Sequence, residues 1–204
     1  MKFKISIILF DQFELLDAFG PAEIFGKEAS HFLLKYYSKN GGVVESAQGT
    51  KILTERYVKE DDYINVLLIP GGQGTRDLVA DRDFIAYIDS LSNYSNYTLS
   101  VCTGAALLAK TKQLDGREAT TNKRAFDWVA DQNHKVIWKR NARWVKSEHF
   151  YTSSGISAGM DMTLGFIKDV VDEATALKIS HRIEYIWNAN SSDDPFAIDS
   201  LVAK

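Results

Sequence analysis

Short apolar runs alternate with helical patterns along most of the chain. Residues 5–10, Ile-Ser-Ile-Ile-Leu-Phe, form a mostly apolar run rich in β-branched residues, which is typical of a strand buried on both faces of a parallel sheet. Similar runs occupy residues 66–69 and 97–101, and they end at the tripeptides of residues 70–72 and 102–104. The pattern predicts three buried strands, and helical patterns follow the second and third of them.

Helical spacing continues into the C-terminal third of the chain. The segments with this spacing, or with a cluster of helix-forming residues, are 83–91, 105–110, 125–129, 157–171 and 172–187. The last segment has one apolar stripe, formed by Ala176, Ile179, Ile183 and Ile186. Alternating strands and helices predict an α/β sandwich with a mostly parallel central sheet and right-handed crossovers. The loops after the strands then form the ligand crevice.

Length and charge narrow the class of protein further. The chain has 204 residues, of which 45% are hydrophobic. This length and composition predict one globular domain over residues 1–187 and a polar tail over residues 188–204. Lys and Arg number 24 against 27 Asp and Glu, and both signs are interspersed, so we expect neither a nucleic acid nor a membrane partner. The first apolar run is too short for a signal peptide, which predicts a cytoplasmic protein.

The single cysteine, Cys102, is the first candidate for chemistry. One thiol excludes an intrachain disulfide and a multi-cysteine metal site, and it fits a reducing compartment. Cys102 lies between a predicted strand and a predicted helix, the position of a nucleophile elbow, where the helix N-terminus would stabilise a thiolate. The alternative is a buried cysteine that acts only as a small hydrophobic residue.

Two glycines and one aspartate are candidate partners of this thiol. Gly71 and Gly72 lack a Cβ atom, so backbone N–H groups here and at Thr103 could form an oxyanion hole; an ordinary turn is the alternative. Asp17 leads into a predicted helix with Pro21 near its first turn, where it could be a plain N-terminal acid. As a proton donor or acceptor beside the thiolate, Asp17 would instead be catalytic.

The histidines offer no better candidates. His31, His134, His149 and His181 show no spacing typical of metal ligands, so we expect no zinc site and no catalytic histidine.

Four segments in the same order resemble the ThiJ/PfpI superfamily. They are residues 68–72, 100–105, 114–121 and 152–161. The resemblance implies a class I glutamine-amidotransferase-like, flavodoxin-like α/β/α sandwich. Residues 16–21 and 102–104 are most similar to isocyanide hydratases and to the sensor-like domains of some AraC-type transcription regulators. The chain ends at Lys204 without a helix-turn-helix region, which favours a stand-alone enzyme.

The resemblance also implies roles for the site residues. Asp17 would contact the sulfur of Cys102, Thr103 would assist, and Gly72 would complete an oxyanion or substrate pocket with Gly71. Gly155 is a further candidate substrate-binding residue. The implied reaction is hydration of a small isocyanide to an N-substituted formamide through a thioimidate on the cysteine, a hydro-lyase activity. It needs no metal or organic cofactor, and the superfamily implies a homodimer.

The chain departs from the superfamily pattern at two places. Asn122 stands where a histidine usually follows Ala-Thr-Thr, and Ser153-Ser154 replace two glycines of a run. The first departure weakens a protease or amidase mechanism and also the glyoxalase III or deglycase branch, which remains an alternative hypothesis. A further alternative is a redox or stress sensor in which Cys102, with a low pKa, is oxidised.

Overall fold

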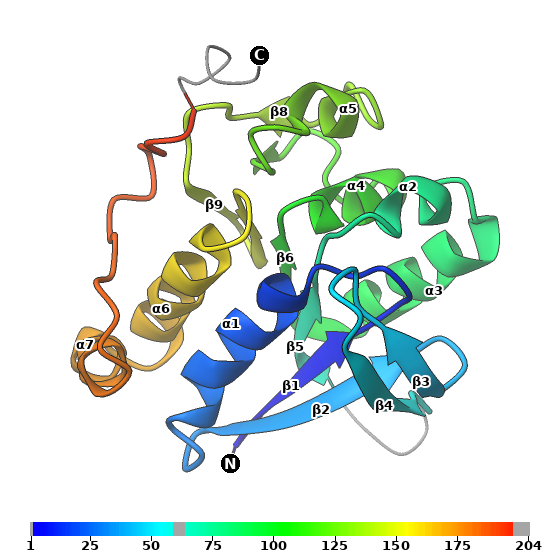
Figure 1. The fold of residues 1–204 in the computed structure, drawn as a ribbon. Helices are drawn as coiled ribbons and strands as arrows, with labels where there is room; N and C mark the ends of the chain where they lie inside the picture. The colour runs from blue at the N-terminus through cyan, green and yellow to red at the C-terminus, as the bar shows by residue number, and fades with distance from the viewer. Residues whose placement is uncertain (1, 59–63, 198–204) are drawn as a thin grey trace.

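A central sheet of eight strands, in the order β3-β4-β2-β1-β5-β6-β10-β9, runs through the computed structural model (Figure 1). The model describes residues 2–58 and 64–197. The strands are β1 (Phe3–Ile8), β2 (Phe32–Ser38), β3 (Gly42–Glu45), β4 (Lys51–Arg56), β5 (Ile64–Ile69), β6 (Ser95–Val101), β9 (Trp144–Ser147) and β10 (Phe150–Ser153). Neighbouring strands are parallel except at the two edges, where β3 and β9 are antiparallel to their partners. The predicted, mostly parallel sheet is confirmed.

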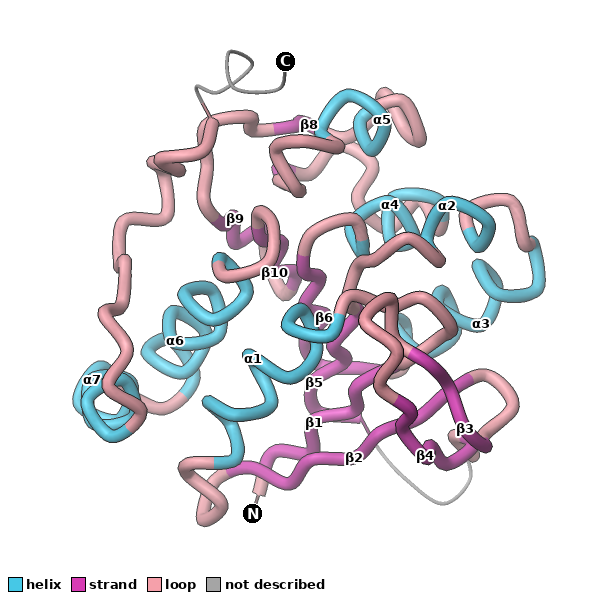
Figure 2. The backbone as a smooth tube through the Cα atoms, in the orientation of Figure 1, coloured by secondary structure: helices cyan, strands magenta, loops and turns pink. Residues whose placement is uncertain are grey.

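Helices cover both faces of this sheet (Figures 1 and 2). On one side lie α1 (Leu15–Gly26), α6 (Ala158–Val170) and α7 (Glu173–Arg182), and on the other lie α2 (Thr75–Leu78), α3 (Arg82–Asn93) and α4 (Gly104–Lys110). A small excursion from the sandwich, residues 118–138, lies above α4 in Figure 1. It contains α5 (Phe126–Ala130) and the short parallel pair β7 (Glu118–Ala119) and β8 (Ile137–Trp138). The α/β/α sandwich predicted from the alternating pattern is therefore correct.

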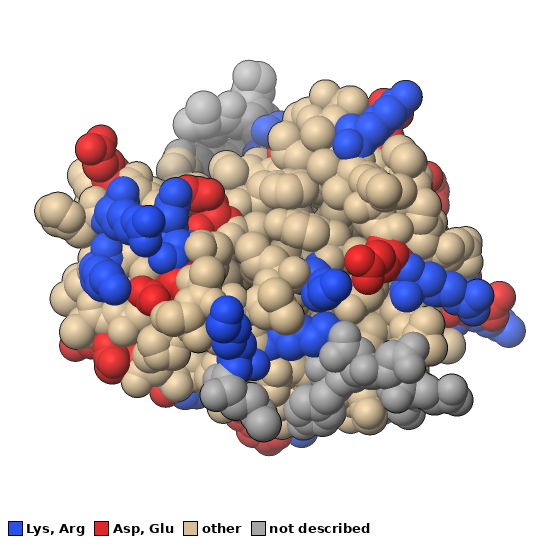
Figure 3. All heavy atoms as spheres, turned by 90° about the horizontal axis from the view of Figure 1, so that it is seen from below, with Lys and Arg blue, Asp and Glu red and all other residues tan. Residues whose placement is uncertain are grey.

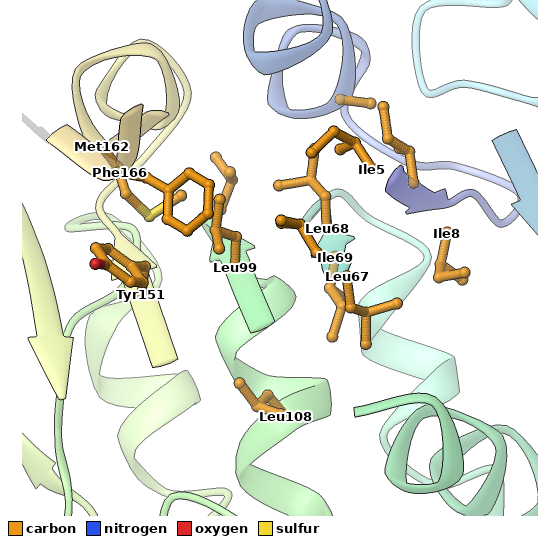
Figure 4. Close-up of a cluster of buried hydrophobic side chains, with 14 of the residues drawn as sticks. Ile5, Ile8, Leu67, Leu68, Ile69, Leu99, Leu108, Tyr151, Met162 and Phe166 are labelled. Carbon is orange, nitrogen blue, oxygen red and sulfur yellow. The ribbon is translucent and has the colours of Figure 1, made fainter. Parts of the chain in front are cut away.

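The apolar runs form strands because both of their faces are covered. Along β1, residues 4–8 are buried, and β5 and β6 bury their last four residues in the same way. Figure 4 shows Leu99 of β6 and Tyr151 of β10 beside Phe166 of α6. The Tyr151 and Phe166 rings meet edge to face, with 5.2 Å between their centroids. Burial on both sides explains why these strands show no alternation of polar residues.

The last predicted helix is shorter than its apolar stripe suggested. Ala176 and Ile179 are buried on α7, but the helix ends at Arg182, and Ile186 lies 93% exposed. Glu184 then adopts a φ of 53°, a left-handed conformation that a continuing helix does not allow. The prediction of a helix to residue 187 is therefore wrong: the chain leaves the helix after Arg182, and although Ile183 still packs against the core, Ile186 does not.

The described surface mixes charges of both signs. On the face seen in Figure 3, Lys and Arg side chains lie next to Asp and Glu side chains on an otherwise uncharged surface. Among residues 2–58 and 64–197, no helix is both long enough and apolar enough to span a membrane.

Candidate active site

Cys102 lies at a strained turn between β6 and α4. Its φ is 57°, a left-handed conformation that is uncommon outside glycine and is typical of a nucleophile elbow. The backbone holds this turn from both sides. The N–H of Cys102 donates to the carbonyls of Ser153 and Ser154, each at 3.2 Å, and its own carbonyl accepts the Thr121 hydroxyl at 2.7 Å. The predicted elbow is present, and its strain is balanced by contacts to two other segments.

Gly71 and Gly72 form a wall beside this turn. Strands β5 and β6 are parallel neighbours, with Ile69 paired to Ser100, so the residues that follow both strands meet at one edge of the sheet. A Cβ atom on Gly71 would lie 2.6 Å from the backbone nitrogen of Thr103 and 2.9 Å from Oδ2 of Asp17. This close approach requires glycine. Gly72 requires it for a second reason, because its φ is 125°.

Asp17 reaches the wall from inside helix α1. Its carboxyl group is completely buried, and Oδ2 accepts the backbone N–H of Gly71 at 2.9 Å. Glu14 is the residue before the helix, so Asp17 is not a helix cap, and Pro21 lies inside the helix rather than in its first turn. The interpretation of Asp17 as a plain N-terminal acid is thus excluded by its contacts.

The two carboxyl oxygens of Asp17 have different surroundings. Oδ1 is buried and has no partner at hydrogen-bonding geometry within the described residues. The carboxyl and the Cys102 thiol nevertheless interact, and their interaction lowers the pKa of Asp17 and raises that of Cys102. The unpartnered Oδ1 therefore has capacity to accept a hydrogen bond from a substrate or a water molecule.

Burial dominates the acid–base properties of the pair. It raises the pKa of Asp17 to about 8, with a backbone hydrogen bond from Gly71 acting in the opposite direction. Burial, followed by the charge of Asp17, raises the pKa of Cys102 well above its usual range. The Thr103 N–H at the start of α4 acts in the expected direction and lowers this pKa, but burial and Asp17 outweigh it. Burial thus disfavours ionisation of this thiol, and a base beside it would assist the loss of its proton.

Two groups would stabilise a thiolate once it forms. The backbone N–H of Thr103 and the side chain of Asn122 both donate toward the sulfur and lower the pKa of Cys102. Asn122 is oriented by the start of α5, since its Oδ1 accepts the N–H of Ala125 at 3.0 Å. That bond leaves the Nδ2 group for the sulfur. The residue that seemed only to replace a histidine is thus a hydrogen-bond donor in the site.

The predicted glycine donors are engaged within the protein. The N–H of Gly72 donates to Oγ1 of Thr103 at 3.0 Å, and the N–H of Gly71 is held by Asp17. Oγ1 of Thr103 also accepts a hydrogen bond from the Thr75 hydroxyl at 3.1 Å, and no sequence motif had pointed to Thr75. An oxyanion hole that used Gly72 would first require the Thr103 hydroxyl to move. The Thr103 N–H is the donor already directed at the sulfur.

Gly155 contributes space rather than a polar group. A Cβ atom there would lie 2.1 Å from Nδ2 of Asn122, so glycine is what allows this amide to approach the elbow. The structure therefore places five of the predicted residues, Cys102, Asp17, Thr103, Gly71 and Gly72, in direct contact around the elbow. It places Gly155 behind Asn122.

The histidines lie elsewhere. His31, His134 and His181 are exposed, and the ring of His149 lies tilted against Phe150, at the opposite end of β10 from Ser153. In the described part of the chain, no three His, Cys, Asp or Glu side chains are grouped so as to hold a metal ion.

A model of the DJ-1/PfpI family matches residues 3–169. This chain belongs to the DJ-1/PfpI family. The matched range contains the sheet, the elbow and every predicted site residue. The resemblance seen in the sequence is thereby confirmed.

Several family members are similar over long stretches. The chain is 26% identical to an isonitrile hydratase of Pseudomonas putida over 185 residues, which are 91% of this chain and 79% of that protein. It is 35% identical to general stress protein 18 of Bacillus subtilis over 121 residues, 57% of this chain and 69% of the relative. A Pseudomonas syringae protein described as ThiJ/PfpI family has a solved structure with a TM-score of 0.79 and 26% identity, covering 91% of this chain and 76% of that chain.

A regulator is also among the relatives. The chain is 23% identical to the HTH-type transcriptional regulator GbdR of Pseudomonas aeruginosa over 195 residues, 93% of this chain but only 53% of the regulator. The relatives thus include both an enzyme and a transcriptional regulator. Family membership alone does not give the function of this chain, which has to be argued from the geometry of the site.

Proposed function

We propose that this protein is a cofactor-independent isocyanide hydratase, an enzyme that adds water to an isocyanide to give an N-substituted formamide. The observation that supports this most is the buried pair of Asp17 and Cys102 beside the elbow, with Oδ1 of Asp17 unpaired. The reaction needs a sulfur nucleophile and one acid–base group that moves protons in both directions, and the pair supplies both. The similarity to an isonitrile hydratase, the same activity under another name, supports the proposal.

The first half of the reaction forms a thioimidate. The Asp17 carboxylate takes the proton of the Cys102 thiol, and the thiolate attacks the terminal carbon of the isocyanide, forming a carbon–sulfur bond. Asp17 then returns this proton to the same carbon, which gives Cys102 S–CH=N–R. Donors at Thr103 and Asn122 stabilise the negative sulfur until the bond has formed.

The second half consumes water and frees the enzyme. Asp17 removes a proton from water while the hydroxide adds to the thioimidate carbon, and the proton passes to the substrate nitrogen. The carbon–sulfur bond then breaks as the carbonyl forms, and the hydroxyl proton returns through Asp17 to the sulfur. The products are the formamide and the original thiol, so no oxidant, reductant or metal is consumed.

The test is turnover of simple isocyanides by the purified protein. Formamide should accumulate in proportion to enzyme, and Cys102→Ala should abolish it, whereas Ser192→Ala, at an exposed position in the C-terminal segment, should leave it unchanged. Circular dichroism of each variant shows that it is folded. Full activity in Cys102→Ala, or no formamide from any of several isocyanides, would refute the proposal.

The alternative activities fit the site less well. Peptide or amide hydrolysis and glyoxalase III or deglycase chemistry rely in this superfamily on the histidine that Asn122 replaces, and an amide cannot accept a proton at neutral pH. Redox sensing requires an acidic thiol, whereas burial raises the pKa of Cys102. Lactate release from methylglyoxal, measured in parallel with the isocyanide assay, separates the glyoxalase hypothesis from ours.

We further propose a homodimer, as the superfamily resemblance implies. Light scattering coupled to gel filtration gives the mass directly, and a species of 22.9 kDa would contradict the dimer.

A further inference from the structure

Arg76 and Trp128 form a stacked pair beside the active-site cysteine. The guanidinium carbon of Arg76 lies 3.5 Å from the centroid of the Trp128 ring, close enough for a cation–π contact. Both side chains are half-buried. The stack fixes a planar cation at one place, with one face covered by the indole ring.

The two residues come from the segments on either side of the elbow. Arg76 follows Thr75, whose hydroxyl donates to Thr103 at 3.1 Å, and it belongs to the helix that starts directly after the glycine wall. Trp128 lies on α5, which begins just after Asn122, the donor to the sulfur. The stack therefore joins the segment that contacts Thr103 to the segment that contains Asn122, and α2, α4 and α5 lie together in Figure 1.

The cation is not neutralised by an acidic side chain. Within residues 2–58 and 64–197, Arg76 forms no ion pair; burial lowers its pKa, and the nearby group that acts in the opposite direction is Cys102. Most cations in and just after the neighbouring excursion do have such partners: Arg140 is paired with Asp127 and Lys139 with Glu118. An oriented guanidinium that lacks an acidic partner and lies near the Cys102 sulfur is suited to a substrate anion, which it can bind through two parallel hydrogen bonds.

We propose that Arg76, held on Trp128, binds a carboxylate carried by the substituent of the substrate, so that the enzyme prefers anionic isocyanides such as isocyanoacetate. The preference rests on the proposed hydratase function, but the anion site itself does not. Glu14, at the start of α1, acts on Asp17 and would repel the same carboxylate. An anionic substituent is therefore directed toward Arg76, and the isocyanide carbon toward the sulfur.

The first experiment compares two isocyanides that differ only in charge. Wild type, Arg76→Gln and Arg82→Gln are assayed with isocyanoacetate and with its neutral methyl ester. Losing a charge-assisted pair should raise KM for the anion by roughly ten- to a hundred-fold in Arg76→Gln and change the ester less than three-fold. Arg82 is an exposed arginine at the start of α3, so Arg82→Gln removes the same charge from the protein without touching the stack.

Arg76→Lys refines the result. A lysine keeps the charge but has no planar fork to stack on the indole ring or to grip two carboxylate oxygens, so the preference for the anion should be intermediate. Equal losses on both substrates in Arg76→Gln would show that Arg76 acts on the sulfur rather than on the substituent, and would overturn the proposal.

The second experiment does not depend on hydration. Cys102 is alkylated with iodoacetate or with iodoacetamide; in each case the carbon–sulfur bond forms as iodide leaves, and the reagents differ in charge. The ratio of the iodoacetate rate to the iodoacetamide rate should fall at least five-fold in Arg76→Gln and stay constant in Arg82→Gln. An unchanged ratio overturns the anion site. A reduced ratio in a protein that hydrates neither isocyanide supports the anion site and refutes the hydratase.

Discussion

At the scale of single residues, the site is governed by one buried proton equilibrium. Asp17 and Cys102 are both almost fully withdrawn from water, so ionising both at once is strongly unfavourable. Burial raises the pKa of Asp17 to about 8 and raises the pKa of Cys102 well above its usual range. In the mechanism that we propose, Asp17 ionises before the thiol, and the pair enters the reaction as a carboxylate and a thiol, with Asp17 as the base.

This order predicts the pH dependence of catalysis. The apparent kcat/KM for a neutral isocyanide should rise with pH and level off above an apparent pKa near 8, because only the carboxylate form of Asp17 can accept the thiol proton. Asp17→Asn should remove this rise and lower the rate by about a hundred-fold or more, the usual effect of losing a general base. A profile that is flat from pH 6 to 9 in the wild type would contradict this assignment.

The same carboxyl predicts how stability depends on pH. A folded-state pKa of about 8 lies above the usual value of 3.8, so between these values the folded protein binds more protons than the unfolded one. The Asp17 contribution to the free energy of unfolding is largest below pH 4 and decreases as the pH rises to about 8. Urea denaturation at pH 5 and pH 8 should show a smaller decrease for Asp17→Asn than for the wild type.

Asn122 predicts a change in thiol reactivity. Asn122→Leu keeps nearly the same volume but removes the donor to the sulfur, so the pKa of Cys102 should rise further and its alkylation by iodoacetamide should slow roughly ten-fold. Asn133→Leu, which removes a similar amide from the loop after α5, should leave the alkylation rate unchanged. Equal rates for wild type and Asn122→Leu would show that the amide does not act on the sulfur.

At the scale of elements, the site depends on how closely β5 and β6 bring their following loops together. Gly71 contacts Thr103 and Asp17 at distances that leave no room for a methyl group. Gly26, at the end of α1, is different: an added Cβ would be 3.6 Å from Leu34, an ordinary contact. These two glycines allow the close approach to be tested apart from the general effect of adding a methyl group.

Gly71→Ala should destabilise the protein and damage the site, whereas Gly26→Ala should do neither. A methyl group at position 71 should lower the free energy of unfolding by about 1–3 kcal/mol. Activity should also fall, because Asp17 and Thr103 must move apart to accommodate it. Thermal melts and isocyanide turnover of both variants measure the two effects. If Gly71→Ala remains as active as Gly26→Ala, the wall is not part of the catalytic geometry.

Much of this arrangement could be predicted from the sequence, for a physical reason. Strands buried on both faces produce unbroken apolar runs, and the parallel topology then places Gly71 and Cys102 at one edge of the sheet. The raised pKa of Cys102 could not be predicted, because it depends on burial by segments far apart in the chain. The same holds for Asn122 and for the contact of Arg76 with Trp128, which meet only after α5 folds over α4.

At the scale of the whole molecule, a buried ionic cluster ties the C-terminal segment to the sheet. Arg143, just before β9, donates from Nε to Asp161 of α6 at 2.6 Å and from Nη1 to Asp194 at 3.4 Å. All three side chains are almost completely buried. Backbone hydrogen bonds also attach this segment, because the carbonyl of Ser191 accepts hydrogen bonds from the N–H groups of Arg143 and Trp144. Residues 188–197, expected as a polar tail, thus include a buried anchor.

This anchor predicts that Asp194 holds the segment in place. Asp194→Ala leaves Arg143 paired with Asp161 but removes one of its buried partners, so the free energy of unfolding should fall by about 1–3 kcal/mol. Protease cleavage between residues 186 and 193 should become faster, because the chain there is no longer attached at both ends. The neighbouring Asp193 is exposed, so Asp193→Ala makes the same chemical change without touching the cluster and should alter neither quantity. If both variants are cleaved at the wild-type rate, the anchor lies in the backbone contacts of Ser191 rather than in the buried charges.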